Sequence, residues 1–227
     1  MSDVAIEVVE DAEAAARLCA ERLMAQARAG GSIVLTGGST PKRAYEIAAE
    51  IEPDWSRVEL WWGDERCVPP DDERSNYGMA KEALLDRLDT APAAVHRIQG
   101  ELGRDGGAAE YERELRDVGT FDLVLLGLGP DGHIASLFPD FPTLDITDRD
   151  AVGTEPGYEP FVDRVTLTLP RLAATRELLF LVTGEDKADA VARALAGEPS
   201  RDTPGSLARP ARGTTRAILD PAAAAKL

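Results

Sequence analysis

The sequence has few of the residues that build disulfide-linked, metal-clipped or membrane-spanning proteins. Its only cysteines are Cys19 and Cys67, one in a helical pattern and one beside an acidic segment, so they predict neither a disulfide framework nor a metal site. No apolar run approaches bilayer length, and the N-terminus lacks the basic region and apolar core of a signal peptide. These absences predict a cytoplasmic protein without a membrane span.

Basic residues are also scarce. The chain has 25 Lys and Arg against 41 Asp and Glu, which gives a formal net charge of −16. Such a surplus of negative charge repels nucleic acid and anionic lipid, so neither is expected as a partner. A solvated, charged surface is sufficient to explain the acidity, and the sequence favours that explanation.

Apolar strands alternate with amphipathic helices along the 227 residues, 44% of which are hydrophobic. This alternation predicts an α/β fold with a mostly parallel sheet and helices on both faces, in a single domain spanning residues 1–227. The strands are predicted at 4–9, 32–36, 58–62, 95–98, 123–126, 164–169, 178–182 and 216–219. The helices are predicted at 11–28, 42–50, 76–88, 108–118, from 186 onward, and at 221–226. Residues 140–160 lack periodicity and predict a long loop, of the kind that often covers a site.

A glycine–hydroxyl segment, 37–41, joins a buried strand to a helix. Free backbone N–H groups and the positive end of the helix dipole converge at such a junction, which is an arrangement that binds phosphate. The hydroxyls of Ser39 and Thr40 would add donors. Thr40 as a simple helix cap is the alternative, and the spacing of a Walker loop is absent. Lys187 begins another helical pattern, where a cation is unfavourable unless it meets an anion.

Residues 121–139 place ionisable side chains directly after a buried strand. Three glycines here match the G-x-G-x-x-G spacing of dinucleotide sites, but Pro139 ends any following helix early, so we expect no dinucleotide. The glycines are instead expected to turn the loop so that His133 faces a pocket. The imidazole of a histidine titrates near neutral pH, which suits a general base.

Charged residues also follow the strand at 58–62. Asp64, Glu65 and Arg66 either belong to a site or form a surface ion-pair cluster, and the sequence leaves both open. His96 is predicted to be a half-buried loop histidine without a catalytic role. Because each polar segment follows its strand, we expect them to meet at one edge of the sheet; they are 37–41, 63–66, 127–133 and 183–187.

The sequence resembles the family of 6-phosphogluconolactonases, which also includes glucosamine-6-phosphate deaminases. The matching segments cover almost the whole chain in the family's order: LTGGSTP (35–41), WWGDERCVPPDDERSNYGMAKEALL (61–85), FDLVLLGLGPDGHIASLFP (121–139), RVTLTLP (164–170) and LVTGEDKADA (181–190). The second and third segments are specific, whereas the first is shared more widely. The resemblance implies a Rossmann-like α/β fold. It also implies hydrolysis of 6-phospho-D-glucono-1,5-lactone in the oxidative pentose phosphate pathway, without a cofactor or a metal.

The resemblance also implies roles for individual residues. His133 is expected to be the catalytic base, Asp131 to shape its loop or orient water, and Arg66 to reach the substrate. The phosphate is expected to bind at Gly38, Ser39, Thr40, Arg164 and Lys187. Further substrate contacts are expected at Asp64 and Gly129. The expected partner is a small phosphosugar lactone, bound by a monomer or a homodimer.

Three alternatives remain beside this reading. Deaminase relatives place a glutamate where this chain has Phe138, so deamination is the weaker of the family's two activities here. A non-catalytic phosphosugar-binding module would usually carry a helix-turn-helix, for which we see no spare residues. A dinucleotide-dependent enzyme is the third alternative.

The sequence departs from the family's pattern at one position beside the histidine. Ile134 follows the histidine where many lactonases have threonine, and this difference leaves the expected chemistry intact.

Overall fold

Parallel strands form the main sheet of the protein. The computed structural model describes residues 4–52 and 54–227, and within these ranges the main sheet has the order β1-β10-β9-β6-β2-β3-β5. Its strands are β1 (Val4–Val8), β2 (Gly31–Leu35), β3 (Val58–Trp62), β5 (Ala94–His96), β6 (Phe121–Leu126), β9 (Thr175–Val182) and β10 (Thr214–Leu219). All neighbours pair in parallel, so the carboxyl ends of the strands share one edge. The predicted α/β fold is confirmed.

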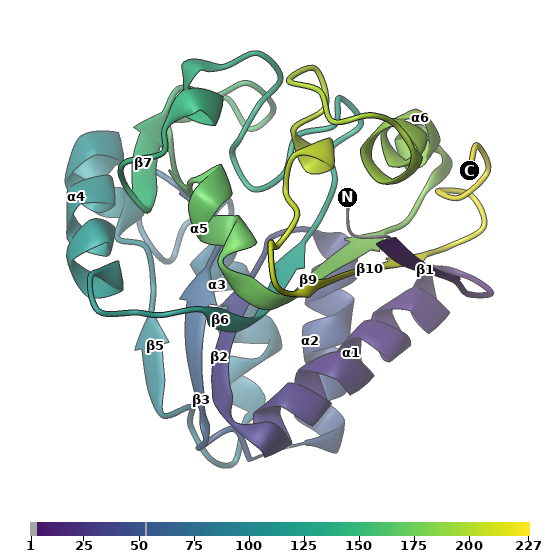
Figure 1. The fold of residues 1–227 in the computed structure, drawn as a ribbon. Helices are drawn as coiled ribbons and strands as arrows, with labels where there is room; N and C mark the ends of the chain where they lie inside the picture. Colours follow the sequence, from purple (N-terminus) through teal and green to yellow (C-terminus); the bar gives the residue numbers. More distant parts are fainter. Residues whose placement is uncertain (1–3, 53) are drawn as a thin grey trace.

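Helices cover both faces of this sheet (Figure 1). They are α1 (Ala12–Ala29), α2 (Ser39–Ile51), α3 (Asn76–Ala83), α4 (Gly103–Leu115), α5 (Leu169–Ala173) and α6 (Ala188–Val191). The short 3-10 helices are η1 (Leu85–Arg87), η2 (Gly100–Leu102), η3 (Pro142–Asp145), η4 (Glu185–Lys187) and η6 (Pro204–Ser206), and η5 (Ala192–Ala196) is a short π-helix. Helices α1 and α2 pack against each other on one face, and α5 lies on the other. Asp11 begins α1 by accepting a hydrogen bond from the N–H of Ala14.

A small antiparallel sheet lies beside the main one. Its order is β4-β8-β7, with β4 (Asp64–Arg66), β8 (Arg164–Leu167) and β7 (Ala151–Thr154). The prediction of one loop over 140–160 is wrong, because η3 and β7 lie within it. Strands as short as β7 are stabilised by cross-strand pairing with a distant segment, which leaves no periodicity in the sequence.

Two predicted helices differ from the structure. Residues 221–226 form turns rather than a closing helix, because so short a segment gains little from helix formation without packing. The helix predicted from residue 186 is instead a succession of η4, α6 and η5. The other predicted helices and strands are present, with ends shifted by a few residues.

The central strand β6 lies inside the core, as its apolar run predicts. Phe121 and the residues from Leu123 to Leu126 are buried. The buried side chain of Tyr45 links α2 to the end of β2: its hydroxyl accepts from the N–H of Thr36 at 3.0 Å and donates to the carbonyl of Thr36 at 2.8 Å. This pair of hydrogen bonds fixes the start of α2 at the edge where the strands end.

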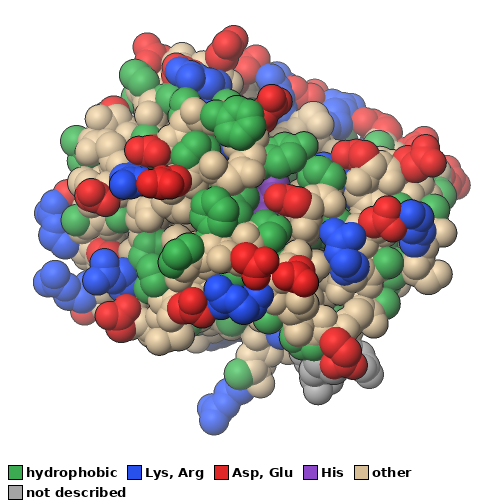
Figure 2. Space-filling model, turned by 90° about the horizontal axis from the view of Figure 1, so that it is seen from above, with side chains coloured by type: hydrophobic (Ala, Val, Ile, Leu, Met, Phe, Trp, Pro, Cys, Tyr) green, Lys and Arg blue, Asp and Glu red, His purple; other side chains and the backbone are tan. Residues whose placement is uncertain are grey.

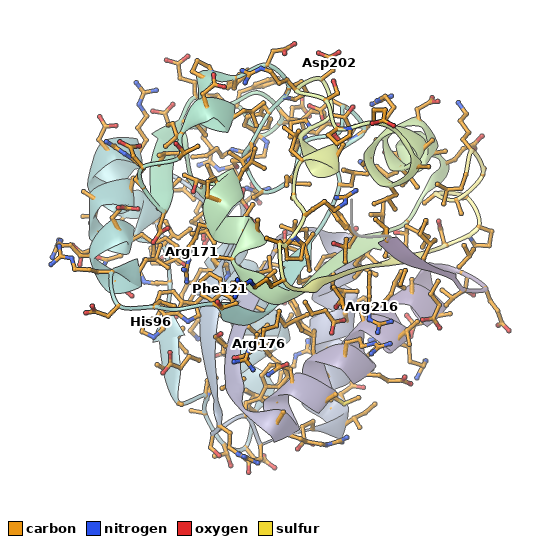
Figure 3. All side chains as sticks on the ribbon, viewed as in Figure 1. His96, Phe121, Arg171, Arg176, Asp202 and Arg216 are labelled. Atoms are coloured by element: carbon orange, nitrogen blue, oxygen red, sulfur yellow. The ribbon has the colours of Figure 1, made fainter. Side chains whose placement is uncertain are left out.

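The surface carries both signs of charge. In Figure 2, acidic and basic side chains are interspersed over the face shown, which fits a solvated surface as the cause of the net charge. None of the helices in the described ranges is long and apolar enough to cross a membrane. His96 lies on β5 (Figure 3), stacks on Trp61 at 3.8 Å between ring centroids, and contacts Glu114 at 2.9 Å. It is part-buried as predicted, and it lies on the strand predicted at 95–98 rather than in a loop.

Candidate active site

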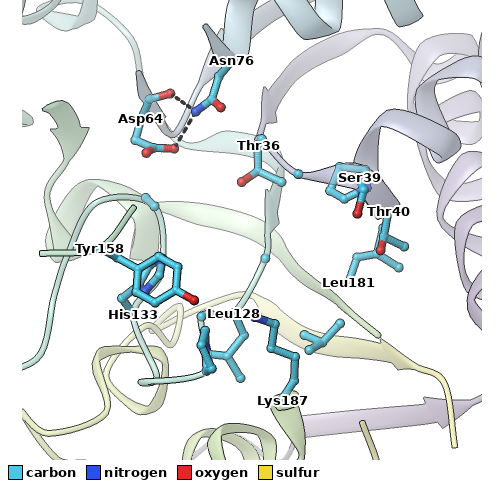
Figure 4. A pocket seen from close by; sticks show the side chains of 18 of the residues that line it. Thr36, Ser39, Thr40, Asp64, Asn76, Leu128, His133, Tyr158, Leu181 and Lys187 are labelled. Atoms are coloured by element: carbon cyan, nitrogen blue, oxygen red, sulfur yellow. Dashed lines mark hydrogen bonds between the residues drawn. The ribbon is translucent and has the colours of Figure 1, made fainter. Parts of the chain in front are cut away.

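A cleft of about 460 Å³ opens at the carboxyl ends of β2, β6 and β9 (Figure 4). The strand order reverses between β2 and β6, because the chain runs from β2 to β3 on one side and returns to β6 on the other. Ligands of parallel α/β sheets bind at such a reversal. Every predicted site residue except Asp131 lines the cleft: Gly38, Ser39, Thr40, Asp64, Arg66, Gly129, His133, Arg164 and Lys187. One crevice therefore joins the histidine to the predicted anion site.

The start of α2 forms one end of the cleft. Gly38 precedes the helix at φ 114°, a backbone conformation that favours glycine, and no side chain caps the helix. Thr40 is therefore not the cap; its hydroxyl lies 2.7 Å from the hydroxyl of Thr183, at the end of β9. The first N–H groups of a helix lack partners within the helix, so this end of the cleft offers donors to an anion.

Lys187 reaches the cleft from the turn after β9. It lies in η4, just before α6, and its ammonium contacts Asp186 at 3.1 Å. The helix α6 is too short for its dipole to be a strong reason to expect an anion at Lys187. The better reason is that Lys187 lines the cleft. The turn is held by Asp220, at the end of β10, which accepts from the N–H of Gly184 at 3.1 Å.

His133 is oriented by its own loop. Its Nδ1 lies 2.6 Å from Oδ1 of Asp131, which also accepts from the backbone N–H of His133 at 3.1 Å. A carboxylate can only accept, so the proton of a neutral ring belongs on Nδ1 and the free lone pair on Nε2. The ring lies against Gly129, where an added Cβ would be 2.1 Å from Nδ1. Gly129 therefore makes room for the imidazole.

Asp131 is ionised at neutral pH. Burial raises the pKa of its carboxyl, but the hydrogen bonds and the charge of His133 outweigh burial and hold the pKa below its ordinary value. A carboxyl whose pKa is lower in the folded state contributes stability above the unfolded pKa. That contribution is lost as the pH falls through the folded pKa. The carboxylate is thus available to stabilise a positive charge on His133.

We expect Asp131→Asn to lower kcat by about 10- to 100-fold. A positioned general base accelerates a reaction by roughly 10²–10⁴-fold, and the loss of its partner carboxylate should remove part of that acceleration. The amide oxygen can still accept from Nδ1–H, but it cannot offset the charge of an imidazolium. Steady-state kinetics on the lactone that the resemblance implies as substrate would show this as a fall in kcat with little change in KM. A variant that keeps the wild-type kcat would exclude any assistance from the carboxylate.

The charged segment at β4 is built into the protein and is not a surface ion-pair cluster. Asp64 is 4% exposed and accepts from the hydroxyl of Ser136 at 2.6 Å and from Nδ2 of Asn76 at 3.2 Å. Glu65 is 2% exposed and joins β4 to α3, because it accepts from the N–H groups of Arg66, Asn76 and Tyr77 and from the hydroxyl of Ser75. Buried carboxylates need such partners, and these fix the geometry around Arg66.

Two arginines are paired across β4 and β8 but differ in their free donors. Arg66 donates from Nη1 to the carbonyl of Arg74 at 2.6 Å, and its buried Nε has no partner among the described residues. Arg164 is 3% exposed and donates to backbone carbonyls and a hydroxyl; these belong to Tyr158, Pro160, Val162 and Ser136. Burial lowers the pKa of Arg164, and its carbonyl partners stabilise the charge. Arg66 lines the cleft and donates to one carbonyl among the described residues, whereas most N–H groups of Arg164 are used.

Sequence reasoning named neither Asn76 nor Tyr158 as a cleft residue, and it placed Thr183 in a segment at the strand ends without giving it a role. Asn76 begins the helix predicted at 76–88, but Ser75 caps α3, and the side chain of Asn76 donates to the carbonyl of Asp64. Its place after the DER segment is a signal that could have been followed. No pattern in the sequence marks Tyr158. Among the residues that the structure describes, no group of three or more His, Cys, Asp or Glu could hold a metal ion, and a metal-free site stays a prediction.

Comparisons of the sequence and of the structure agree with each other. The family described as glucosamine-6-phosphate isomerases/6-phosphogluconolactonase matches residues 7–217. The 6-phosphogluconolactonase of Streptomyces coelicolor is 42% identical over 94% of this chain and 89% of its own. That of Homo sapiens is 38% identical over 93% of this chain and 87% of its own. The crystal structure of 6-phosphogluconolactonase from Thermotoga maritima has a TM-score of 0.84 at 32% identity, and the match covers 96% of this chain and 100% of that one.

Proposed function

The chain belongs to the glucosamine-6-phosphate isomerase/6-phosphogluconolactonase family, and we propose that it hydrolyses 6-phospho-D-glucono-1,5-lactone to 6-phospho-D-gluconate. This carboxylic ester hydrolysis is a step of the oxidative pentose phosphate pathway. The observation that carries the proposal is the single cleft that contains both the imidazole of His133 and the uncapped start of α2. A base and an anion site in one cleft suit a substrate that has an ester carbonyl and a phosphate.

In this mechanism His133 is the general base. Its Nε2 takes a proton from water while the water oxygen attacks the lactone carbonyl, and the carbonyl oxygen becomes an oxyanion. The bond between the carbonyl carbon and the ring oxygen then breaks, and the imidazolium returns its proton to that oxygen, which becomes a hydroxyl. The carboxylic acid of the open chain loses its proton to solvent. Asp131 holds Nδ1–H throughout and stabilises the imidazolium.

Positive and N–H groups elsewhere in the cleft bind the rest of the substrate. Arg66, which lines the cleft, is the proposed donor to the oxyanion. The phosphate is proposed to lie at Gly38, Ser39 and Thr40, with Lys187 as its counter-ion. Asp64 is the proposed acceptor for a sugar hydroxyl. In a protein with a net charge of −16, an anionic substrate needs such local donors.

The residue at 138 supports lactone hydrolysis over deamination. Phe138 is 1% exposed, and its ring centroid lies 5.1 Å from that of His133. A phenyl ring cannot transfer a proton, so the position offers nothing to the ring opening that precedes deamination. The same ring contributes an apolar wall beside His133.

The proposed function predicts rapid hydrolysis of freshly made 6-phosphogluconolactone. A pH-stat would measure acid release, corrected for spontaneous opening of the lactone. Glucosamine 6-phosphate should release no ammonia, and NADP should leave the melting temperature unchanged. Ammonia release without lactone hydrolysis would reverse the choice between the family's two activities. Inactivity toward both, with sugar-phosphate binding retained, would favour the non-catalytic module.

We also propose that the protein acts in the cytoplasm as a monomer or a homodimer without a metal or a cofactor. Light scattering after gel filtration would measure the oligomeric state, and activity in the presence of EDTA should equal activity without it.

A further inference from the structure

The segment 156–162, here called the strap, brings an aromatic side chain to the candidate base. Tyr158 lines the cleft, and its ring centroid lies 5.3 Å from that of His133 at an interplanar angle of 42°. In Figure 4 the Tyr158 ring lies over His133, and its hydroxyl points into the cleft, on the side of Leu128 and Lys187. No hydrogen bond joins that hydroxyl to the other residues drawn.

The strap is held in place at two points. The buried guanidinium of Arg164 donates to the carbonyls of Tyr158 at 2.8 Å, Pro160 at 2.9 Å and Val162 at 3.2 Å. At the other point the backbone of Gly157 packs on Phe138, so closely that an added Cβ would lie 2.4 Å from the phenyl ring. Charge-assisted bonds from an arginine to carbonyls are stronger than neutral ones, so the backbone around Tyr158 is fixed, while the residue as a whole stays 41% exposed.

From this geometry we propose that Tyr158 is a further substrate-contacting residue. Its ring covers one side of His133, and its hydroxyl hydrogen-bonds a hydroxyl of the bound sugar lactone. Arg164 then acts through the strap as a positioning residue, and it is not a direct ligand of the phosphate. The inference deepens the proposed function and rests on it.

The donor count at Arg164 supports this division of roles. A guanidinium has five N–H groups, and here Nε and Nη2 are used by the strap while Nη1 faces Ser136 and Asp64. A phosphate at this arginine would compete with the carbonyls that hold the strap. The start of α2 and Lys187 have no such commitment to the strap.

The first test compares Tyr158→Phe with Tyr158→Ala, and Phe161→Ala serves as the control because Phe161 is 70% exposed on the same strap and does not line the cleft. One neutral hydrogen bond corresponds to about two- to tenfold in affinity. We therefore expect Tyr158→Phe to raise KM for the lactone by about that factor with kcat nearly unchanged, and Tyr158→Ala to raise it further. The Kd for inorganic phosphate, which probes the anion site alone, should stay at the wild-type value.

The second test separates the positioning role of Arg164 from phosphate binding. Arg164→Lys removes the guanidinium N–H groups that hold the strap carbonyls, so it should raise KM for the lactone as Tyr158→Ala does. The variant that combines Arg164→Lys with Tyr158→Ala should show little further increase in KM. An increase in the Kd for inorganic phosphate in Arg164→Lys, measured on protein with a normal circular dichroism spectrum, would overturn the positioning role. If Arg164→Lys does not fold, Tyr158→Phe alone decides.

The outcomes also distinguish this inference from the proposed function. A wild-type protein that hydrolyses the lactone, with Tyr158→Phe and Tyr158→Ala both indistinguishable from it, would overturn the role of Tyr158 and leave the proposed function intact. A wild-type protein without lactonase activity would overturn the proposed function, and the present inference with it. A loss in Phe161→Ala equal to that in Tyr158→Ala would show that the strap matters only for folding.

Discussion

His133→Ala should lower kcat for lactone hydrolysis by about 10²–10⁴-fold, the contribution that a positioned general base typically makes. The substitution removes the Nε2 that takes the proton from water, and it leaves the start of α2 and Lys187 unchanged. Binding of the product 6-phosphogluconate should therefore stay close to wild type. Initial rates in a pH-stat, after subtraction of spontaneous opening, would measure the first quantity, and titration calorimetry would measure the second.

The chain offers one matched control for this variant, because His96 is its only other histidine. His96→Phe keeps an aromatic ring on Trp61 and removes the contact with Glu114. Since His96 lies on β5 and does not line the cleft, its variant should keep the wild-type kcat. Near-full activity in His133→Ala, above the spontaneous background, would exclude His133 as the base.

Gly129→Ala should lower kcat by about 10²-fold or more, which is the scale of loss from misplacing a reacting group by about 1 Å. The new methyl group would lie 2.1 Å from Nδ1 of His133 and 2.6 Å from Oδ1 of Asp131, so the imidazole and its carboxylate partner must separate or move. Gly129 is not among the glycines at positive φ, so the backbone itself tolerates alanine. The effect therefore reports on the position of the ring.

Gly119→Ala is the control for the added methyl group. Gly119 precedes β6 as Gly129 follows it, it also lies outside the positive φ region, and nothing lies within 4 Å of a Cβ built there. It should retain wild-type kinetics. A crystal structure of Gly129→Ala should show the His133 ring displaced, and wild-type kcat with an undisplaced ring would contradict the proposed arrangement.

The main sheet was predictable from the sequence because its central strands are buried on both faces. β6 and β9 each contain a continuous apolar run that ends at a turn with glycine, and such runs mark strands of a parallel sheet. Parallel pairing then places the segments after β2, β6 and β9 at one edge. Most of the candidate site follows from that rule alone.

The small sheet and the strap were not predictable in this way. The four residues of β7 are held by pairing with β8, so their conformation depends on contacts that no local pattern records. Tyr158 lies in a Gly-Tyr-Glu-Pro stretch, and it reaches His133 only because Arg164 holds the backbone around it. The resemblance implies that Arg164 binds phosphate. The reason to propose a positioning role instead is that its Nε and Nη2 already donate to the carbonyls of the strap.

The burial of β4 shows that its charged residues do not form a surface ion-pair cluster, a question that the sequence left open. Asp64 and Glu65 read equally well as surface charges or as site residues, because charge alone does not reveal depth. Their hydrogen bonds to Ser136, Asn76 and the start of α3 place them inside the protein. The depth of a charged side chain is set by partners far away in the chain, and in this protein those partners come from two different segments.

The position of β10 between β1 and β9 bears on how the protein is made. Among the described strands of the main sheet β1 is synthesised first, whereas β10, with which it pairs, is synthesised last. Asp220 follows directly and holds the turn that carries Lys187. The nascent chain can thus build β2, β3 and β6 in order, but the turn that carries Lys187 is fixed only after β10 and Asp220 have been made and have docked.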